Sequence, residues 1–100
     1  NVRGIAIVRR KFLFGDYLEL LGIAPSAIGQ GLGGRLLSHV ESLTFARANN
    51  MFACVSDFND GARAFYRKQG YMEIGPMPNF LVPGYAEILL RKTNGPARKS

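Results

Sequence analysis

The chain has 100 residues, of which 47% are hydrophobic and 20% are charged. This length and composition suit one compact domain and exclude a disordered or collagen-like protein. No apolar run reaches the roughly 20 residues that a membrane-spanning helix requires, and no secretory signal pattern is visible. The lone cysteine, Cys54, cannot form an internal disulfide, so we expect a reducing, cytoplasmic setting.

The formal net charge is +6. Such a charge favours an anionic partner, namely nucleic acid, a membrane surface or a phosphate-rich cofactor. The basic residues gather at Arg9–Lys11, an expected turn, and in the C-terminal tail. The sequence contains neither an aromatic and basic RNA-binding pattern nor a helix-turn-helix pattern. We therefore expect no membrane partner, and we rank nucleic acid below a phosphate-rich cofactor.

The chain opens with two predicted strands. The apolar run Gly4–Val8 and the segment Tyr17–Ile23 both have strand patterns, and a proline ends the second. Gly22 indicates a bulge or a close backbone approach within the second strand. If the pleat of that strand is regular, Glu19 and Ile23 lie on the same face.

Two helices are predicted further along the chain. The first follows a glycine-rich segment and ends at Asn49–Asn50, because apolar residues recur there at helical spacing. These apolar residues are Leu32, Leu36, Leu37, Val40, Leu43 and Ala48. Asn59 can cap the second helix, Asp60–Gln69, and Gly70 is a typical C-terminal stop for it.

Three further strands complete the predicted elements. They are Met51–Ser56, Tyr71–Ile74 and Tyr85–Arg91, and the segment Gly75–Gly84, with three prolines, is expected to be a loop. The resulting order, β-β-α-β-α-β-β, predicts an α/β or α+β fold with a mixed central sheet. We expect a single domain over residues 1–92 and a flexible basic tail over residues 93–100.

A run of glycines, Gly29-Gln30-Gly31-Leu32-Gly33-Gly34, lies between the second strand and the first helix. Glycines let the backbone approach a ligand closely and adopt positive φ angles. The first amides of a helix have no internal partner, and the helix dipole adds partial positive charge there. A diphosphate fits such a site, and Arg35 adds a full positive charge beside it.

The same glycines also match the G-x-G-x-x-G fingerprint of dinucleotide-binding domains, at Gly29, Gly31 and Gly34. In that fold, however, the glycines follow their strand immediately and further strand–helix units come after them. Here residues 24–28 intervene, and the chain ends in strand, loop and strand. A dinucleotide site is therefore the second choice for the phosphate ligand.

Two segments together carry a resemblance to a known family. The segment IAPSAIGQGLGGRLL, residues 23–37, resembles the acetyl-CoA motif of the GNAT superfamily of N-acyltransferases, V-x-P-x-x-(Q/R)-x-x-G-x-(G/A)-x-x-L-L. Pro25, Gly31 and Gly33 match that motif, whereas Ile28 stands where Gln or Arg is usual. Residues 59–71 resemble the second signature, N-x-x-A-x-x-(F/L)-Y-x-x-x-G-(F/Y), at every specified position.

The resemblance implies acetyl-CoA as the acyl donor and no metal. It also implies that one set of residues contacts the cofactor: Ile23, Ala24, Gly29, Gln30, Gly31, Leu32, Gly33, Gly34, Arg35, Asn59, Ala62 and Tyr66. The usual strand and two helices at the N-terminus of the family's fold are absent from this sequence. Because the chain also opens inside a strand without a starting Met, we interpret it as a fragment or a truncated domain.

The predicted reaction is attack of a primary amine, of a small molecule or a protein, on the thioester. Tyr66 is the candidate general acid for the leaving thiolate, and by helical spacing it shares a face with Asn59 and Ala62. Glu19 is the candidate general base, with Asp57 and Asp16 as weaker alternatives. The resemblance also assigns backbone groups near Leu21–Ile23 to the pantetheine and thioester oxygen, and the loop at residues 75–84 to the acceptor site.

Two alternatives remain open for the function. The first is a CoA-binding or regulatory module without turnover, and the second is a basic nucleic-acid-binding domain. Sheet edges left exposed by a missing N-terminal strand would favour self-association, so a homodimer is one expected assembly.

Overall fold

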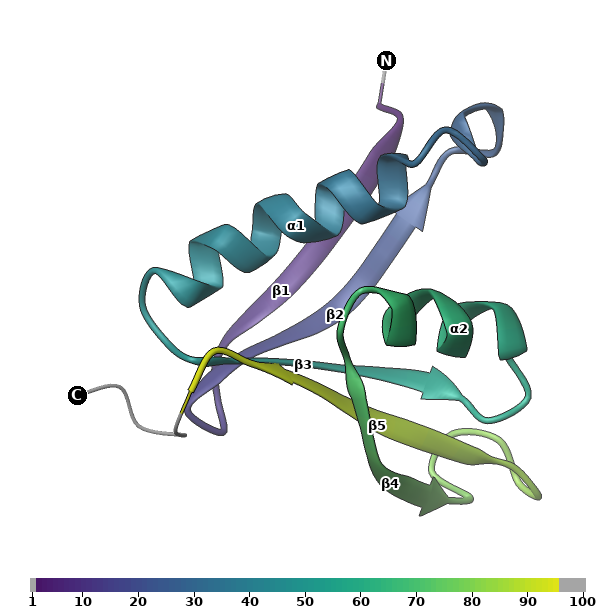
Figure 1. The fold of residues 1–100 in the computed structure, drawn as a ribbon. Helices are drawn as coiled ribbons and strands as arrows, with labels where there is room; N and C mark the ends of the chain where they lie inside the picture. Colours follow the sequence, from purple (N-terminus) through teal and green to yellow (C-terminus); the bar gives the residue numbers. More distant parts are fainter. Residues whose placement is uncertain (1, 96–100) are drawn as a thin grey trace. The chain divides into compact units, whose positions relative to one another are not determined.

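The computed structural model describes residues 2–95. Its elements are β1 (Gly4–Phe12), β2 (Gly15–Ile23), η1 (Pro25–Ala27), α1 (Leu32–Phe45), β3 (Asn50–Ser56), α2 (Asp60–Lys68), β4 (Met72–Pro78) and β5 (Ala86–Thr93). The strands belong to one mixed sheet in the order β1-β2-β3-β5-β4, which confirms the predicted class and element order (Figure 1). The chain divides into two compact units, and residues Phe52–Lys92 form the second of them.

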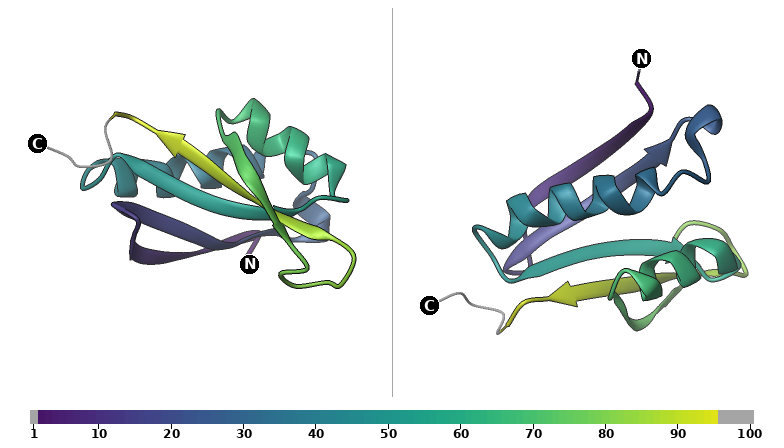
Figure 2. Two further views of the ribbon diagram at one scale, coloured as in Figure 1. Left: turned by 90° about the horizontal axis from the view of Figure 1, so that it is seen from below. Right: turned by 45° about the horizontal axis from the view of Figure 1, so that its top comes forward.

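The first unit is built on a hairpin of β1 and β2, with α1 packed along one face of the hairpin (Figure 2). The strand β1 is four residues longer than predicted, because pairing with β2 continues through its basic residues. Backbone hydrogen bonds supply this pairing whatever the side chains are, so a hydrophobic pattern underestimates the length of such a strand.

A bulge interrupts β2 at Glu19. Ile7 lies opposite Leu20 and Val8 lies opposite Leu18, so Glu19 is the extra residue between them. Gly22 is paired with a residue of β1 in ordinary register, and the bulge predicted at that glycine is therefore wrong. Because a bulge breaks the alternation of side chains, the argument that Glu19 and Ile23 share a face fails as well.

A buried carboxylate joins the start of β2 to the end of α1. The side chain of Asp16 is fully buried and accepts hydrogen bonds from Thr44 Oγ1 at 2.6 Å, from the Arg47 guanidinium and from the backbone amide of Lys11 at 3.3 Å. Burial by itself would raise the pKa of Asp16, but the hydrogen bonds from Arg47 and Thr44 outweigh it and hold that pKa below its usual value. The Asp16 carboxylate therefore links the start of β2 to the end of α1.

The buried face of α1 differs from the predicted apolar face. Its buried residues are Leu37, Glu41 and Thr44, whereas Leu43 is 57% exposed. Thr44 is drawn inward by its hydrogen bond to Asp16, and residues spaced by three or four positions turn inward with it. The helix also ends at Phe45, several residues before the predicted Asn49–Asn50.

The second unit contains α2 with β4 and β5, and its helix has the predicted ends. The Asn59 side chain accepts a hydrogen bond from the Ala62 amide at 3.0 Å, and Gly70 follows the helix with a φ of 96°. Tyr66 is the buried residue of α2. Sequence and structure therefore agree on this helix to within one residue at its C-terminal end.

The strand β4 extends into the segment that was predicted to be a loop. Gly75–Pro78 pair with β5 in antiparallel register, after an irregularity between Glu73 and Gly75. Proline is compatible with this strand because β4 lies at the end of the sheet, where amides on the outer side need no partner. The predicted loop is thereby shortened to residues 79–85. The predicted tail begins within β5, and its residues 96–100 lie outside the described part of the chain.

Candidate functional site

The backbone between η1 and α1 is open to a ligand. Gly29 and Gly31 have φ angles of 87° and 72°, and a Cβ atom placed at either glycine would meet nothing within 4 Å. Such φ angles favour glycine, and the free space lets a ligand come close to the chain. Gly33 and Gly34, which were predicted in this turn, instead belong to the first turn of α1.

The N-terminus of α1 offers backbone amides to the same region. The amide of Arg35 donates to the carbonyl of Gly31 at 3.2 Å, which is the first backbone bond of the helix. The amides of Leu32–Gly34 precede that bond, and the helix dipole makes this end partially positive. The arrangement suits an anionic group such as a diphosphate.

Two arginine side chains add positive charge at this helix end. Arg3 and Arg35 line an open hollow of about 430 Å³ together with Gly4, Leu32 and Leu36. Arg3 also donates a hydrogen bond to the Gln30 side-chain oxygen. The Gln30 side-chain nitrogen donates to the Ser26 carbonyl at 3.4 Å. The first unit therefore carries the charge that an anionic cofactor would require, although the Gln30 side chain already has partners within the unit.

The end of β2 is less open than the glycine turn. The Ala24 amide donates to the Arg3 carbonyl at 2.6 Å, and the Ala24 carbonyl accepts from the Ala27 amide at 2.8 Å. Ile23 is paired with Gly4 in the hairpin. The backbone groups of Ala24 are thus used inside the first unit, which leaves the glycine turn as the stronger part of the predicted cofactor site.

The side chain of Glu19 forms an ion pair with Arg9. The guanidinium Nε of Arg9 donates to Glu19 Oε1 at 2.6 Å, and the Glu19 side chain is 33% exposed. Arg9 belongs to the neighbouring strand β1, so the ion pair joins the two strands near the bulge. Any role for Glu19 as a proton acceptor therefore has to include Arg9.

In the second unit, Tyr66 is a buried phenol within a group of aromatic rings. The ring of Tyr66 lies 5.2 Å from that of Phe65 and 5.3 Å from that of Tyr71, in edge-to-face geometry in both cases. Burial raises the pKa of Tyr66 to about 12. The phenol therefore keeps its proton at neutral pH, as a general acid must.

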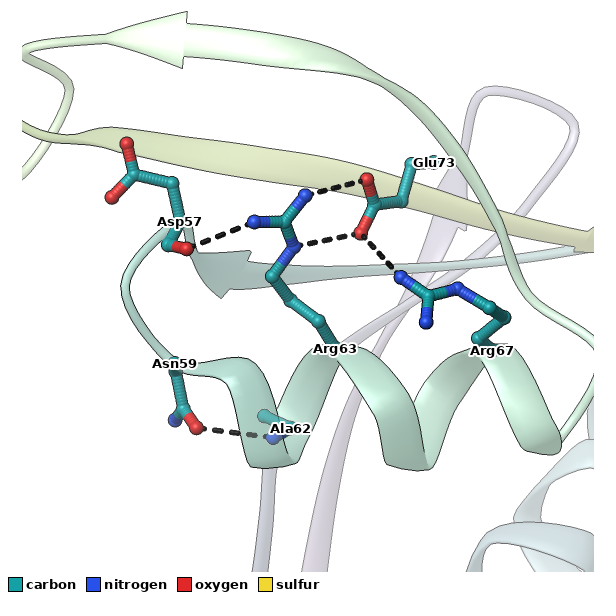
Figure 3. A network of polar contacts seen from close by, with 6 residues as sticks. All are labelled: Asp57, Asn59, Ala62, Arg63, Arg67 and Glu73. Atoms are coloured by element: carbon teal, nitrogen blue, oxygen red, sulfur yellow. Dashed lines mark hydrogen bonds and ion pairs between the residues drawn. The ribbon is translucent and has the colours of Figure 1, made fainter.

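Sequence reasoning missed a cluster of charged residues next to this helix (Figure 3). Arg63 donates to both carboxylate oxygens of Glu73, each at 2.9 Å, and to the backbone carbonyl of Asp57 at 2.9 Å. The hydrogen bond from Arg63 is the main reason why the pKa of Glu73 lies below its usual value. Ten positions separate Arg63 from Glu73 on different elements, so no spacing rule would have found the pair.

The carboxylate of Asp57 stands at the end of β3. Its Oδ2 accepts from the Ala86 amide at 3.0 Å, while its buried Oδ1 has no hydrogen-bond partner within residues 2–95.

The predicted site residues fall into two groups, one in each compact unit. The turn residues and Glu19 belong to the first unit, and Asn59, Ala62 and Tyr66 belong to the second.

Residues 2–95 contain neither a metal-binding cluster nor a membrane-spanning helix. No three His, Cys, Asp or Glu side chains of residues 2–95 come together in a way that could hold a metal ion. Neither of the described helices has the length and apolar character needed to cross a membrane.

A mixed sheet with an open glycine turn before its first long helix and a capped second helix agrees with the α/β fold predicted from the sequence, and comparisons with known proteins identify the family. The family model described as "Acetyltransferase (GNAT) family" matches residues 4–71. Because this match covers more than half of the sequence, the chain belongs to the GNAT acetyltransferase family.

Two relatives and one solved structure illustrate the similarity. The chain is 32% identical over 93 residues to N-alpha-acetyltransferase RimI of Mycobacterium tuberculosis (strain ATCC 25618 / H37Rv), covering 92% of this chain and 58% of that protein. It is 33% identical over 76 residues to 5-NmdU N-acetyltransferase of Pseudomonas phage PaMx11, covering 75% and 53%. A GNAT family acetyltransferase from Elizabethkingia anophelis, solved with acetyl-CoA bound, has a TM-score of 0.85 at 18% identity and covers 93% and 69%.

The chain spans little more than half the length of the curated relatives that it matches, 58% of one and 53% of the other. At 18% identity, the likeness to the solved structure concerns the fold alone.

Proposed function

We propose that this protein transfers the acetyl group of acetyl-CoA to a primary amine of a small molecule or a protein. The observation that carries the proposal is the open backbone at Gly29 and Gly31, directly before the N-terminus of α1. Membership of the GNAT family supports it, as do two relatives whose names describe N-acetyltransferases. In this proposal, the backbone of residues 29–34 and the Arg35 guanidinium hold the diphosphate.

Tyr66 is the proposed general acid. The amine nitrogen forms a bond to the thioester carbonyl carbon, the bond from that carbon to sulfur breaks, and the sulfur receives the phenolic proton. Burial raises the pKa of Tyr66 to about 12, so the phenol is protonated at neutral pH and is a weaker acid than an ordinary tyrosine, and it donates its proton only as negative charge develops on the sulfur. Asn59 and Ala62, at the start of the same helix, are proposed to contact the pantetheine arm. The phenolic proton leaves on the CoA thiol, and Tyr66 regains a proton from solvent, into which the base releases the proton lost by the amine.

Glu19 remains the proposed general base, acting on the amine directly or through one water. Its ion pair with Arg9 keeps the carboxylate in one place and also competes with the amine for it. Removal of Arg9 leaves the carboxylate in place but without its competing partner, whereas removal of Glu19 takes away the proposed base itself.

The alternative candidate is a CoA-binding module without turnover. A specific observation favours it, because each of the three carboxylates considered as a base already has a partner. Arg9 pairs with Glu19, Thr44 and Arg47 bind Asp16, and the Ala86 amide binds Asp57. Such a module would bind acetyl-CoA and acetylate no amine.

The acceptor site is proposed to include the loop at residues 79–85. Phe80 and Tyr85 are exposed there, and the Tyr85 ring lies 5.0 Å from the ring of exposed Phe58. Exposed aromatic rings of this kind suit contact with an acceptor. We also propose a cytoplasmic location, because the single Cys54 fits a reducing compartment.

Self-association is a further part of the proposal. The strand β1 lies at the end of the sheet and exposes Ile5 and Ile7, so a second copy of the chain is the proposed partner for that edge. Light scattering over a range of concentrations tests this, and a monomer at every concentration would exclude it.

The assay for the function is acetyl transfer to a panel of amines, followed by mass spectrometry of the products. We expect acetylation of at least one amine, a fall in kcat/KM of about tenfold or more for Glu19→Gln, and a smaller change for Arg9→Gln. Binding of acetyl-CoA without acetylation of any amine would favour the module without turnover. An unchanged kcat/KM in Glu19→Gln would remove that residue from the mechanism.

A further inference from the structure

The guanidinium of Arg63 connects three elements of the second unit. Its Nε and one terminal nitrogen bind the two carboxylate oxygens of Glu73 in β4, and its other terminal nitrogen binds the Asp57 carbonyl just beyond β3 (Figure 3). All three distances are 2.9 Å. A planar guanidinium that makes three bonds in fixed directions sets orientation as well as distance.

Arg63 stands between the two ends of the proposed catalytic segment of α2. The Arg63 amide donates to the Asn59 carbonyl at 3.0 Å, in the first turn of the helix. Tyr66 follows Arg63 by three positions, which is the spacing of neighbours on a helix surface. A helix of nine residues has little stability of its own, so contacts with its surroundings must fix its position.

Arg67, one turn later, provides a natural comparison. It approaches the same Glu73 at only 3.9 Å, and its side chain is 66% exposed, against 29% for Arg63. Arg67 therefore contributes charge near Glu73 without the paired hydrogen bonds. Comparing substitutions at these two arginines of one helix therefore separates the effect of charge near Glu73 from the effect of hydrogen-bond geometry.

We infer that Arg63 is a positioning residue, which fixes the N-terminal half of α2 against Asp57 and Glu73 and thereby sets the place of Tyr66. The inference rests on the proposed function of Tyr66 as general acid. Arg63 itself touches neither the substrate nor the reacting atoms in this account. A shift of the helix start by about 1 Å is enough to lower the rate of a reaction that depends on alignment.

Four variants test the inference. Arg63→Lys keeps the charge but cannot make the paired bonds to Glu73 together with the bond to Asp57, and Glu73→Gln weakens the same contact from the other side. Arg67→Lys is the matched control for charge. Ala64→Gly is the matched control for stability, because Ala64 is exposed on α2 and glycine destabilises any helix.

We expect Arg63→Lys and Glu73→Gln to lower kcat about tenfold or more while KM for acetyl-CoA changes by about threefold or less. KM should change only slightly because the glycine turn holds the diphosphate, and the proposed contacts of Asn59 and Ala62 with the pantetheine arm account for a change of up to about threefold. Both controls should keep kcat within about twofold of the original chain, at a temperature where all variants are folded. An equal loss of kcat in Ala64→Gly, or no loss in Arg63→Lys, would overturn the inference.

Failure of the proposed function is distinguishable from failure of the inference. If the original chain acetylates no amine, the role of Tyr66 as general acid fails. Hydrogen exchange at the Ala62 amide then tests separately whether Arg63 fixes the start of α2. Faster exchange in Arg63→Lys but not in Arg67→Lys would support the fixing of the helix start by Arg63. Equal exchange in both variants would contradict it.

Discussion

Burial determines what individual side chains of this protein can do. Tyr66 is a phenol that keeps its proton because it is enclosed by other rings, and Asp16 is a carboxylate that keeps its charge because three groups donate to it. The sequence motif indicated Tyr66 as the candidate general acid, which stays a prediction. The role of Asp16 depends on Thr44 and Arg47, about thirty positions away, and no local pattern could have predicted it.

The variant Tyr66→Phe tests the proton donor. It removes the hydroxyl and keeps the ring, so we expect kcat to fall about 10- to 100-fold while the affinity for acetyl-CoA, measured by calorimetry, stays the same. With the pKa of Tyr66 raised to about 12, its deprotonation should not lower kcat of the original chain between pH 8 and about pH 10. Retention of full kcat in the variant would exclude Tyr66 as the acid.

The variant Asp16→Asn tests the buried carboxylate. We expect it to lower the free energy of unfolding by about 1–3 kcal/mol, because the fully buried carboxylate loses its charge-assisted hydrogen bonds, whereas the Arg47 side chain is 37% exposed and its charge stays partly solvated. The folded-state pKa of Asp16 is lowered, so its stabilising contribution is present above the ordinary value of 3.8 and is lost as the pH falls through the folded-state pKa.

Denaturant unfolding of both proteins at pH 7 and near pH 3 measures these effects. The difference in unfolding free energy between the original chain and Asp16→Asn should shrink at the lower pH. A difference that stays constant with pH would show that the charge of Asp16 does not stabilise the fold.

At the scale of elements, the sequence predicted the order of strands and helices and the ends of α2. Those ends have local causes, namely the Asn59 cap and the positive φ of Gly70. Other features depend on neighbours in the sheet. The bulge lies at Glu19 because of its pairing with β1, and β4 tolerates prolines because it lies at the end of the sheet.

The variant Gly15→Ala tests the start of β2. A Cβ at Gly15 would overlap the backbone carbonyl of Asn50, which cannot move without disturbing the chain around it. We expect a loss of about 3 kcal/mol or more in the free energy of unfolding. Gly75→Ala is the matched control in a strand, since a Cβ there meets nothing within 4 Å, and it should change stability little. Similar stability in both variants would contradict this packing.

At the scale of the whole molecule, the two motifs fall in different compact units of one chain. The first unit holds the glycine turn and the second holds Tyr66. The family was predictable from the two motifs because each is local in sequence. The acceptor was not, because its site would be formed by loop side chains such as Phe80, whose spacing carries no chemical signature.

Titration calorimetry with acetyl-CoA tests the central claim most directly, with the original chain compared with Gly33→Glu and Gly33→Gln. A Glu in the first turn of α1 favours the helix itself but repels an anionic ligand, and Gln has nearly the same size without the charge. We predict binding by the original chain, no detectable binding by Gly33→Glu and intermediate affinity for Gly33→Gln. Equal binding by all three proteins, or none by the original chain, would contradict a cofactor site at this turn.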